Sequence, residues 1–578
     1  MRNWELALEK WEAFKQLDPA LRTQLDNLAG NREALEEAFY KELTFGTGGM
    51  RGVLGPGTNR MNIYTVRKAV DGLARFLLFE CVNVKDRGVV VAYDSRYMSQ
   101  EFAVETAKVL GAYGIKAYVF ESLRPTPLLS YAVRYFGAVA GVMITASHNP
   151  PEYNGFKVYN ETGGQMVPQE ADKVIVKIQE VENELLIPVV EAETLEAEGL
   201  LYWIGDEVDN AYLDQLALIS KMKRTEMEES KDLGIVFTPL HGTGHHLVMR
   251  GLEQLHFENV NVVAEQAVPD PEFSTVDSPN PEEHQAFAMA MKQGIELQAD
   301  ILLGTDPDAD RLGVAVKDQT GSYKVLTGNQ LGSLLIDYIL SHTEPVLLKN
   351  GRVLKTIVTT QFGQAIAKSY GVETMDTLTG FKYIAEKIRH FDETGETFMF
   401  GFEESYGYLI SSFVRDKDAV QAAVMACEMA HYWKKKGKTL LEALDLLKEK
   451  HGYFLEGMSS LTLKGIEGSR QIAHIMEAFR KEKITNIAGL TIENVEDYLA
   501  GERNNLITGS IEEIELPKEN VLKFNLENNS WVCLRPSGTE PKIKCYYGVC
   551  STSNEESEAS LAKLKKEMDE RIQALINA

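Results

Sequence analysis

The chain has no long uninterrupted apolar run. Its 578 residues contain no stretch that approaches the roughly 20 apolar residues needed to span a bilayer. The N-terminus also lacks a signal pattern, because its tryptophans and leucines alternate with charged residues as in an amphipathic helix. We therefore expect no secretory leader and no membrane partner.

Cysteine and positive charge are scarce as well. Five cysteines, an odd number without the spacing of metal ligands, indicate reduced thiols in a cytoplasmic protein. The net charge of −25 disfavours a nucleic-acid or membrane surface, but it allows an anionic substrate if the site is locally basic. Nothing in the sequence indicates an obligate protein partner.

What the chain does have is length and an ordinary globular composition, with 44% apolar and 25% charged residues. It is too long for one hydrophobic core. Three successive β-α-β-α-β patterns each end in an apolar strand that leads into a polar loop, and an acidic, largely helical segment with a connector at 185–201 follows the first. We predict an α/β protein with three similar mixed-sheet domains and a smaller C-terminal α+β domain. The expected boundaries are residues 1–205, 206–320, 321–452 and 453–578.

The first polar loop, at residues 145–150, reads Thr-Ala-Ser-His-Asn-Pro. It follows a buried apolar strand, and α/β folds place their chemistry at such strand ends. Ser147 with His148 beside it is a candidate nucleophile. Taken alone, the hexapeptide reads equally well as a polar turn. Lys157 lies ten residues further on, where a hairpin can return it to the serine, although an exposed lysine is the simpler interpretation.

The second polar loop carries Asp306, Asp308 and Asp310. In an extended backbone, alternate side chains lie on one side, so we expect the three carboxylates to converge. Carboxylate oxygens select a hard cation, Mg²⁺ before Mn²⁺ or Ca²⁺. An EF-hand is excluded, because Arg311 and Lys317 stand where its glycine and glutamate belong. A solvated acidic turn is the remaining alternative.

Three further loops carry groups suited to phosphates and hydroxyls. Arg51 ends a glycine-rich loop, which is either an anion-binding arm or a hinge. Residues 535–539, Arg-Pro-Ser-Gly-Thr, offer a guanidinium, hydroxyls and backbone N–H groups for a phosphate, or form a plain turn. Glu403 and Ser405 would face one way in an extended loop and suit sugar hydroxyls. Together with the serine and the aspartates, these loops indicate phosphoryl transfer on a sugar phosphate.

Through these loops the chain resembles the α-D-phosphohexomutase superfamily, close to its phosphoglucomutase and phosphopentomutase branch. The loops described above resemble, in the family's order, its arginine segment, phosphoserine loop, metal loop, sugar loop and phosphate loop. The resemblance spans roughly residues 40–550. It implies four domains around a central cleft and a small-molecule sugar phosphate as the partner.

The resemblance also implies residue roles. Ser147 would carry a phosphoryl group, pass it to the 6-hydroxyl of glucose 1-phosphate and take the 1-phosphate back from glucose 1,6-bisphosphate. Mg²⁺ would be held by the three aspartates and a phosphoserine oxygen. Charge stabilisation would be the main source of rate. The cationic and polar groups around the transfer would be Arg51, His148, Lys157 and Arg311, and the substrate would contact Thr379, Gly380, Lys382, Glu403, Ser405, Arg535, Ser537, Gly538 and Thr539.

Three questions stay open at this stage. Tyr406 and Gly407 follow the sugar-loop serine where phosphomannomutases tend to carry Gly-His, and residues 377–382 resemble the specificity loop of phosphoglucomutases, which favours glucose over mannose. Ribose 1-phosphate remains an alternative substrate. A phosphoserine-bearing sensor without turnover or a sugar phosphatase are the alternative functions. For the base that deprotonates the sugar hydroxyl we expect Lys157, since extended backbone would turn His148 away from Ser147.

Overall fold

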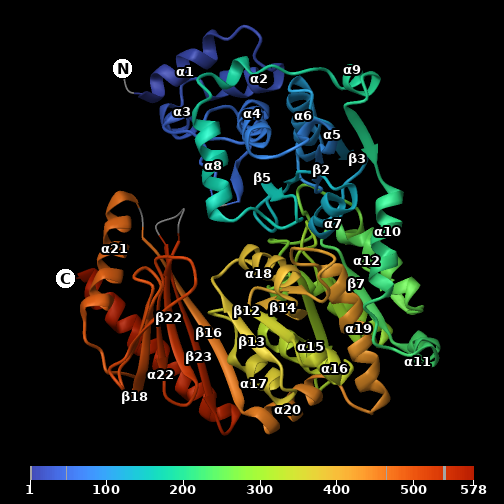
Figure 1. Cartoon of the computed structure of the whole chain (residues 1–578), viewed down its shortest axis with the longest axis vertical. Helices are drawn as coiled ribbons and strands as arrows, with labels where there is room; N and C mark the ends of the chain where they lie inside the picture. The colour runs from blue at the N-terminus through green and yellow to red at the C-terminus, as the bar shows by residue number, and fades with distance from the viewer. Residues whose placement is uncertain (1–2, 47, 464, 538–541, 578) are drawn as a thin grey trace. The chain divides into compact units, whose positions relative to one another are not determined.

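The structure is a computed structural model, and it describes residues 3–46, 48–463, 465–537 and 542–577 (Figure 1). The chain forms two compact units, and neither is continuous in sequence. The first unit contains Met1–Gly328 and Phe381–Thr439, and the second contains Asn329–Gly380 and Leu440–Ala578. Within the described residues, no helix is both long and apolar enough to cross a membrane.

The first unit begins with three short helices, α1 (Asn3–Ala13), α2 (Pro19–Leu28) and α3 (Arg32–Phe39). The fully buried ring of Trp11 joins them to the rest, because it makes edge-to-face contacts with Phe39 and Tyr64 at centroid distances of 5.6 and 5.4 Å. The helical, amphipathic start predicted from the sequence is confirmed.

A six-stranded sheet follows, in the order β1-β5-β4-β2-β3-β6. Its centre is parallel, while β5 runs antiparallel to both β4 and β1, so the sheet is mixed. Strand β6 begins at the last residue of the segment predicted as a connector, and it pairs with β3. The strands are β1 (Gly49–Val53), β2 (Val89–Tyr93), β3 (Ala117–Phe120), β4 (Ala140–Ile144), β5 (Tyr153–Asn160) and β6 (Leu201–Ile204), and the helices between them include α4 (Ile63–Glu80), α6 (Ser99–Ala112), α7 (Thr126–Phe136), α8 (Pro168–Gln179) and α10 (Asp206–Ala217).

A second sheet of the first unit has the order β11-β10-β9-β7-β8. Strands β7, β8 and β9 are parallel, as the β-α-β-α-β pattern predicts. Strands β10 and β11 extend the sheet antiparallel and were not predicted. The elements are β7 (Ile235–Thr238), α12 (Gly244–Gln254), β8 (Val260–Val262), α14 (Ala288–Leu297), β9 (Ile301–Thr305), β10 (Leu312–Lys317) and β11 (Tyr323–Val325).

Residues 381–439 complete the first unit. They form α18 (Phe381–Thr394), the antiparallel pair β14 (Thr397–Glu403) and β15 (Gly407–Leu409), and α19 (Ala419–Lys435). Helix α19 packs against α12, and both lie beside β7 in Figure 1.

The second unit combines a parallel pair, β12 (Gly351–Thr356) and β13 (Glu373–Thr377), with an antiparallel C-terminal sheet. The apolar face of that sheet is covered by α21 (Gly465–Lys481) and α22 (Asn554–Asn577), which contribute Phe479 and Leu564 to its core. The α+β character predicted for this domain agrees with the structure. Its strands are β16 (Tyr453–Thr462), β17 (Asn486–Ile487), β18 (Leu490–Asp497), β19 (Glu502–Asn505), β20 (Ile511–Glu513), β21 (Leu522–Leu526), β22 (Ser530–Pro536) and β23 (Lys542–Ser551), and the unit also contains α15 (Gly328–Ser341), α17 (Gln361–Ser369) and α20 (Leu440–His451).

Candidate active site

Ser147 lies in the tight loop between β4 and β5, and its backbone is left-handed, with φ of 53°. Its buried hydroxyl donates to Oδ2 of Asp306 at 2.8 Å and lies 3.2 Å from Nδ1 of His148. The extended loop predicted here is wrong. Because the chain turns at Ser147, the serine and histidine side chains meet instead of pointing apart.

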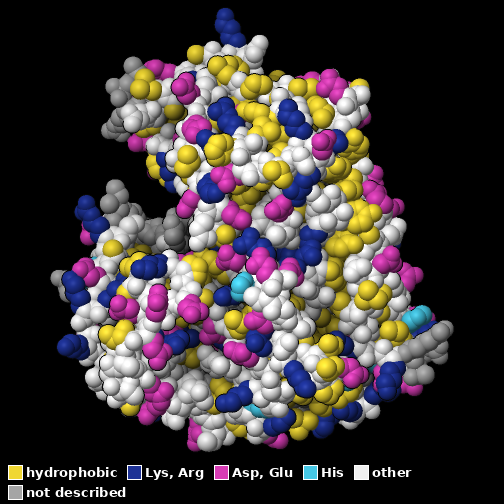
Figure 2. Space-filling model, viewed as in Figure 1, with side chains coloured by type: hydrophobic (Ala, Val, Ile, Leu, Met, Phe, Trp, Pro, Cys, Tyr) yellow, Lys and Arg dark blue, Asp and Glu magenta, His cyan; other side chains and the backbone are white. Residues whose placement is uncertain are grey.

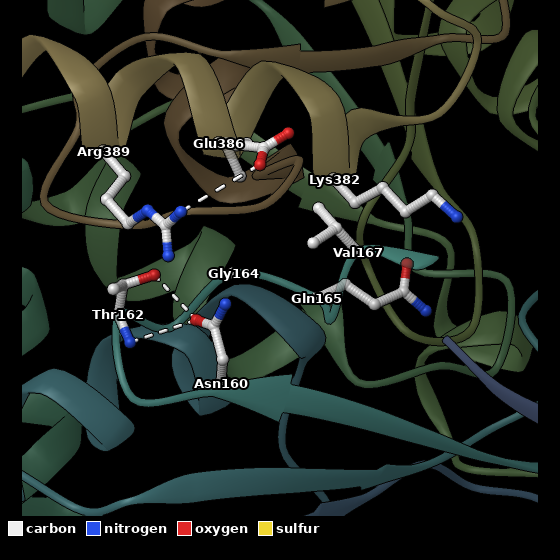
Figure 3. A pocket seen from close by; sticks show the side chains of 9 residues that line it. Asn160, Thr162, Gly164, Gln165, Val167, Lys382, Glu386 and Arg389 are labelled. Atoms are coloured by element: carbon white, nitrogen blue, oxygen red, sulfur yellow. Dashed lines mark hydrogen bonds and ion pairs between the residues drawn. The ribbon is translucent and has the colours of Figure 1, made fainter. Parts of the chain in front are cut away.

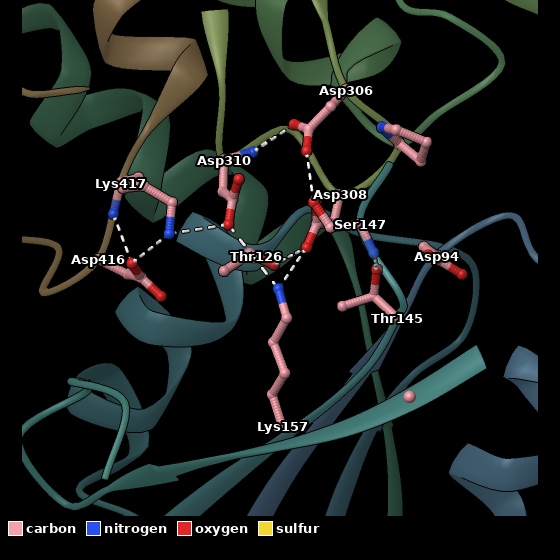
Figure 4. Close-up of polar contacts among 12 residues, drawn as sticks. Asp94, Thr126, Thr145, Ser147, Lys157, Asp306, Asp308, Asp310, Asp416 and Lys417 are labelled. Carbon is pink, nitrogen blue, oxygen red and sulfur yellow. Dashed lines mark hydrogen bonds and ion pairs between the residues drawn. The ribbon is translucent and has the colours of Figure 1, made fainter. Parts of the chain in front are cut away.

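Asp306, Asp308 and Asp310 are buried, and one carboxylate oxygen of each lies within 4.8 Å of the other two (Figure 4). The predicted convergence is present, but the predicted extended backbone is not. Residues 307–309 form a turn in which Ala309 has φ of 49°. The turn, rather than alternation along a strand, brings the three side chains to one point.

The donor set of this triad suits a hard cation. Oδ1 of Asp308 and Oδ1 of Asp310 are buried and have no hydrogen-bond partner among the described residues. Unpaired buried carboxylate oxygens are costly unless a cation reaches them. Burial and the neighbouring carboxylates raise the pKa of Asp306 well above its usual value. Although burial would also raise the pKa of Asp308, Lys157, Asp306 and Lys417 together outweigh that effect and lower it.

Two lysines approach the triad. Lys157, on β5, contacts Asp308 at 2.7 Å and Asp310 at 3.8 Å, so the β4–β5 hairpin brings it to the aspartate triad. Lys417, from the loop before α19, contacts Asp310 at 3.0 Å and Asp416 at 3.2 Å (Figure 4). The sequence analysis missed Lys417. The only signal was the alternating charge of residues 415–418, which lie about a hundred positions beyond the triad.

The arginines predicted for the site have polar partners beside it. Arg51 donates from Nη1 to Oδ1 of Asn149, two residues after Ser147, at 2.8 Å. Arg311 pairs with Glu282 and lies 3.9 Å from Asp310. Burial, with the charges of Arg311 and Arg51, lowers the pKa of His148 to about 3. The imidazole is therefore neutral at neutral pH.

A loop that the sequence analysis left without a role supports the metal triad. After β7, Thr243 donates from its backbone N–H and its hydroxyl to the carbonyl of Pro307, at 2.8 and 2.9 Å. A Cβ at Gly242 would lie 2.4 Å from Cα of Pro307, so only glycine allows this approach. The loop thus braces the turn that carries the aspartates.

The sugar loop is also a turn. Glu403 is the last residue of β14 and pairs with Gly407 on β15, so its backbone is extended as predicted. Ser405 lies within the turn between the two strands, which corrects the extended backbone predicted for that residue. The carbonyl of Tyr406 accepts from the N–H of Leu312, the first residue after the Asp310–Arg311 segment. The sugar loop and the metal loop are therefore joined directly within the first unit.

The remaining predicted substrate residues are divided between the units. Thr379, Gly380, Arg535 and Ser537 lie in the second unit, and Lys382 lies in the first. Ser537 donates its N–H to the carbonyl of Lys542 at 2.7 Å. Gly538 and Thr539 lie outside the described residues.

Lys382, in the first turn of α18, lines a small pocket between that helix and the loop after β5 (Figure 3). Asn160, Thr162 and Arg389 also line it. On the face seen in Figure 2, acidic and basic side chains are interspersed, and the atoms coloured by type show no continuous basic area. That pattern agrees with the net charge of −25.

Comparison with known proteins covers almost the whole chain. Residues 42–185, 210–321 and 327–449 match alpha/beta/alpha domains I, II and III of the phosphoglucomutase/phosphomannomutase family, and residues 481–570 match its C-terminal domain. The phosphoglucomutase of Staphylococcus epidermidis strain ATCC 35984 is 40% identical over 518 residues, which is 89% of this chain and 92% of that protein. The phosphoglucomutase of Staphylococcus aureus strain MRSA252 is 40% identical over 515 residues, 89% of this chain and 90% of that protein.

Solved structures share the fold at lower identity. Parafusin from Paramecium, a phosphoglucomutase, aligns over 93% of this chain and 95% of its own, with a TM-score of 0.68 and 16% identity. A phosphoglucomutase/phosphomannomutase family protein from Burkholderia thailandensis aligns over 92% and 97%, with a TM-score of 0.66 and 18% identity. These likenesses confirm the predicted fold class. With all four domains matched and two fifths of the residues shared with curated phosphoglucomutases, the chain belongs to the phosphoglucomutase/phosphomannomutase family of the α-D-phosphohexomutases and is an enzyme of phosphoryl transfer.

Proposed function

We propose that the protein interconverts α-D-glucose 1-phosphate and glucose 6-phosphate through a phosphorylated Ser147 and a glucose 1,6-bisphosphate intermediate. The observation that carries the proposal is the placement of the Ser147 hydroxyl 2.8 Å from the buried Asp306 of a carboxylate triad. A nucleophile next to a hard-cation site and several cationic side chains is the arrangement that phosphoryl transfer needs.

In the proposed cycle, phosphoserine 147 gives its phosphoryl group to the 6-hydroxyl of glucose 1-phosphate, and that hydroxyl loses its proton. The resulting bisphosphate turns over and presents its 1-phosphate. The hydroxyl of Ser147 then takes that phosphoryl group and releases glucose 6-phosphate. The enzyme ends as it began, so the reaction needs no external phosphate donor.

Mg²⁺ fits the triad, and we propose that Asp306, Asp308, Asp310 and an oxygen of phosphoserine 147 hold it. The observation that supports this fit is the pair of buried oxygens of Asp308 and Asp310 that accept no hydrogen bond within the described residues. When bound, the ion would withdraw charge from the phosphoryl oxygens. Lys157 and Lys417 contact these carboxylates in the structure, and their side chains are then available to the phosphoryl group.

The side chains around the metal triad have separate proposed roles. Lys157 is the proposed base or proton relay for the sugar hydroxyl, and neutral His148 is the proposed hydrogen-bond donor to the phosphoserine. Arg51 and Arg311 would neutralise the transferring group. The substrate would be held by Thr379, Gly380, Lys382, Glu403, Ser405, Arg535, Ser537, Gly538 and Thr539.

Glucose is favoured over other sugars by two observations. Tyr406 and Gly407 occupy the positions after the sugar-loop serine, and the curated relatives at 40% identity are named phosphoglucomutases. Ribose 1-phosphate and mannose 1-phosphate remain the alternative substrates. The intact triad and serine argue against a sensor without turnover. We place the enzyme in the cytoplasm, with small sugar phosphates as its only proposed partners.

The deciding experiment assays glucose 1-phosphate, ribose 1-phosphate and mannose 1-phosphate side by side, with Mg²⁺ and a trace of the matching bisphosphate. The proposal expects the highest kcat/KM for glucose 1-phosphate and no net release of inorganic phosphate. A higher kcat/KM for ribose 1-phosphate or mannose 1-phosphate would make the enzyme a pentomutase or mannomutase. Steady release of phosphate would make it a phosphatase.

A further inference from the structure

Arg96 is a fully buried arginine that the catalytic cycle does not use. It lies in the loop between β2 and α6, and neither its side chain nor that of the neighbouring Asp94 is accessible to solvent. Its Nε lies 3.4 Å from Oδ2 of Asp94, so the charge has a partner. A buried guanidinium costs free energy unless its N–H groups have hydrogen-bond acceptors.

The four terminal N–H groups of Arg96 have four acceptors, all backbone carbonyls of the phosphoserine loop and the start of β5. Nη1 donates to the carbonyls of Pro150 and Tyr153, at 2.8 and 3.0 Å. Nη2 donates to the carbonyls of Ser147, at 2.5 Å, and Asn149. The planar guanidinium thus binds four carbonyls through its terminal N–H groups, while its Nε makes no hydrogen bond within the described residues and contributes only the ion pair with Asp94.

The backbone N–H of Ser147 is also hydrogen-bonded, and a network of side chains surrounds Arg96. The backbone N–H of Ser147 donates to the hydroxyl of Thr145 at 2.8 Å, and Asp94 accepts from the N–H of Arg96 and the hydroxyl of Ser99. On its other face, Arg96 lies against the buried ring of Phe273, 4.9 Å from its centroid. Both peptide groups of the serine are thus fixed by side chains outside the reacting centre.

We propose that Arg96 is the positioning residue of the phosphoryl-carrying loop: it holds Ser147 in its left-handed conformation and so places the serine oxygen on the metal triad. This inference rests on the proposed function. A serine with φ of 53° is uncommon for a non-glycine residue and needs its surroundings to maintain it. A misplacement of about 1 Å can cost about hundredfold in rate, so this clamp affects kcat more than substrate binding.

The test compares Arg96→Met, Arg96→Lys and Phe273→Leu with the wild type. A matched control is Arg67→Met, which removes a partly buried arginine of the same domain whose Nε donates to Glu105 and not to the serine loop. The first readout is amide hydrogen exchange of residues 145–153, which needs no activity. The second is kcat and KM for glucose 1-phosphate, measured on protein phosphorylated with glucose 1,6-bisphosphate.

We expect faster exchange across 145–153 in Arg96→Met and Arg96→Lys, and kcat lower by about hundredfold with KM within about threefold of wild type. Lysine should not rescue kcat, because one ammonium cannot reach four carbonyls. Phe273→Leu keeps every hydrogen-bond donor of Arg96, so its exchange rate and its kcat should lie between those of the Arg96 variants and those of Arg67→Met. It also keeps the test open if the arginine variants do not fold.

Unchanged exchange in these variants would overturn the inference whatever the activity. Faster exchange with an unchanged kcat would also overturn it, because the conformation of the loop would then have no effect on the rate. Full rescue by Arg96→Lys would do the same, because a positive charge alone would then hold the loop. A wild type without mutase activity would refute the proposed function instead. In that case the exchange data would still decide whether Arg96 holds the loop.

Discussion

The hydroxyl of Ser147 and Nδ1 of His148 lie 3.2 Å apart, although the two residues are neighbours in sequence. The left-handed backbone at Ser147 is the reason, since an extended chain would direct them to opposite sides. Two side chains, His148 and Lys157, therefore compete for the role of proton acceptor near the serine. Their contacts differ, because Lys157 contacts the aspartates and His148 contacts the serine itself.

The two candidates can be separated by substitution. We expect Lys157→Ala to lower kcat by about a thousandfold, within the usual range for loss of a general acid or base, and His148→Gln to lower it by about tenfold. Steady-state assays with glucose 1-phosphate and saturating Mg²⁺ provide the measurement. The control is Lys116→Ala, a half-buried lysine just before β3 that pairs with Asp86. If His148→Gln has the larger loss and Lys157→Ala is nearly normal, the two roles are exchanged.

Replacement of Ser147 tests the covalent step. Intact mass of the protein treated with glucose 1,6-bisphosphate should show one phosphate, and Ser147→Ala should show none. Mutase activity of the alanine variant should fall by at least about a thousandfold, because the nucleophile is lost. Ser130→Ala is the control, since that hydroxyl is buried in the same domain and binds backbone groups only. Near-normal turnover in Ser147→Ala would refute the mechanism.

The metal triad predicts a strict need for a divalent cation. Asp308→Asn should lose Mg²⁺-dependent activity and the increase in melting temperature on adding Mg²⁺, while it folds normally, because the ligands lie on a turn and not in a core. The control is Asp300→Asn, which lies at the opposite end of β9 and pairs with Lys434. A wild-type rate that survives chelation would mean that the aspartates have a structural role.

Arg535, the next-to-last residue of β22, tests whether the second unit contributes to substrate binding. We expect Arg535→Ala to raise KM by about ten- to hundredfold with little effect on kcat, because a lost charge-assisted contact costs about 1.5–3 kcal/mol. Arg503→Ala, on β19 of the same sheet, is the control, since that arginine pairs with Glu496. Unchanged KM and kcat would place Arg535 outside the substrate site.

The raised pKa of Glu456, on β16, should make the stability of the protein depend on pH. Burial raises its pKa to about 7, although Thr360 and Asn329 donate hydrogen bonds to it. The folded protein therefore keeps a proton that the unfolded chain releases near its ordinary pKa of 4.5. Stability from this group is complete below about pH 4.5, falls as the pH rises towards 7 and stays low above it.

Glu456→Gln removes this dependence, because an amide resembles the protonated carboxyl. The melting temperature of the variant, relative to that of the wild type, should rise between pH 5 and pH 8. The corresponding change in the free energy of unfolding is on the order of 3 kcal/mol at most. Differences between the two proteins cancel the other titrating groups. A constant difference across this range would show that Glu456 titrates normally.

The order of elements was readable from the sequence where apolar periodicity is strong. Strand β4 and helix α4 are such cases, because each buries a continuous apolar face. The short strand β6, with its exposed Tyr202 and Trp203, carries no such pattern, and only its pairing with β3 makes it a strand. The antiparallel extension by β10 was missed for another reason, since the residues after Arg311 were considered only as an EF-hand loop.

The site was predictable as residue types but not as geometry. Ser147 and the three aspartates were found because chemistry demands those groups in polar loops after strands. Their convergence depends on turns at Ser147 and Ala309, and positive φ at a non-glycine residue has no sequence signature. Lys417 and Arg96 were missed because their partners are distant in sequence and backbone carbonyls carry no identity.

The division of the chain into two discontinuous units has a consequence for synthesis. Residues 329–380 emerge from the ribosome before residues 440–578, which belong to the same compact unit. Meanwhile residues 381–439 complete the first unit. Residues 329–380, which lie between the two segments of the first unit in sequence, therefore cannot complete their own unit until the last quarter of the chain has been translated. A single break in the chain cannot free either unit, and a stop codon near residue 450 would leave residues 329–380 without the segment on which they pack.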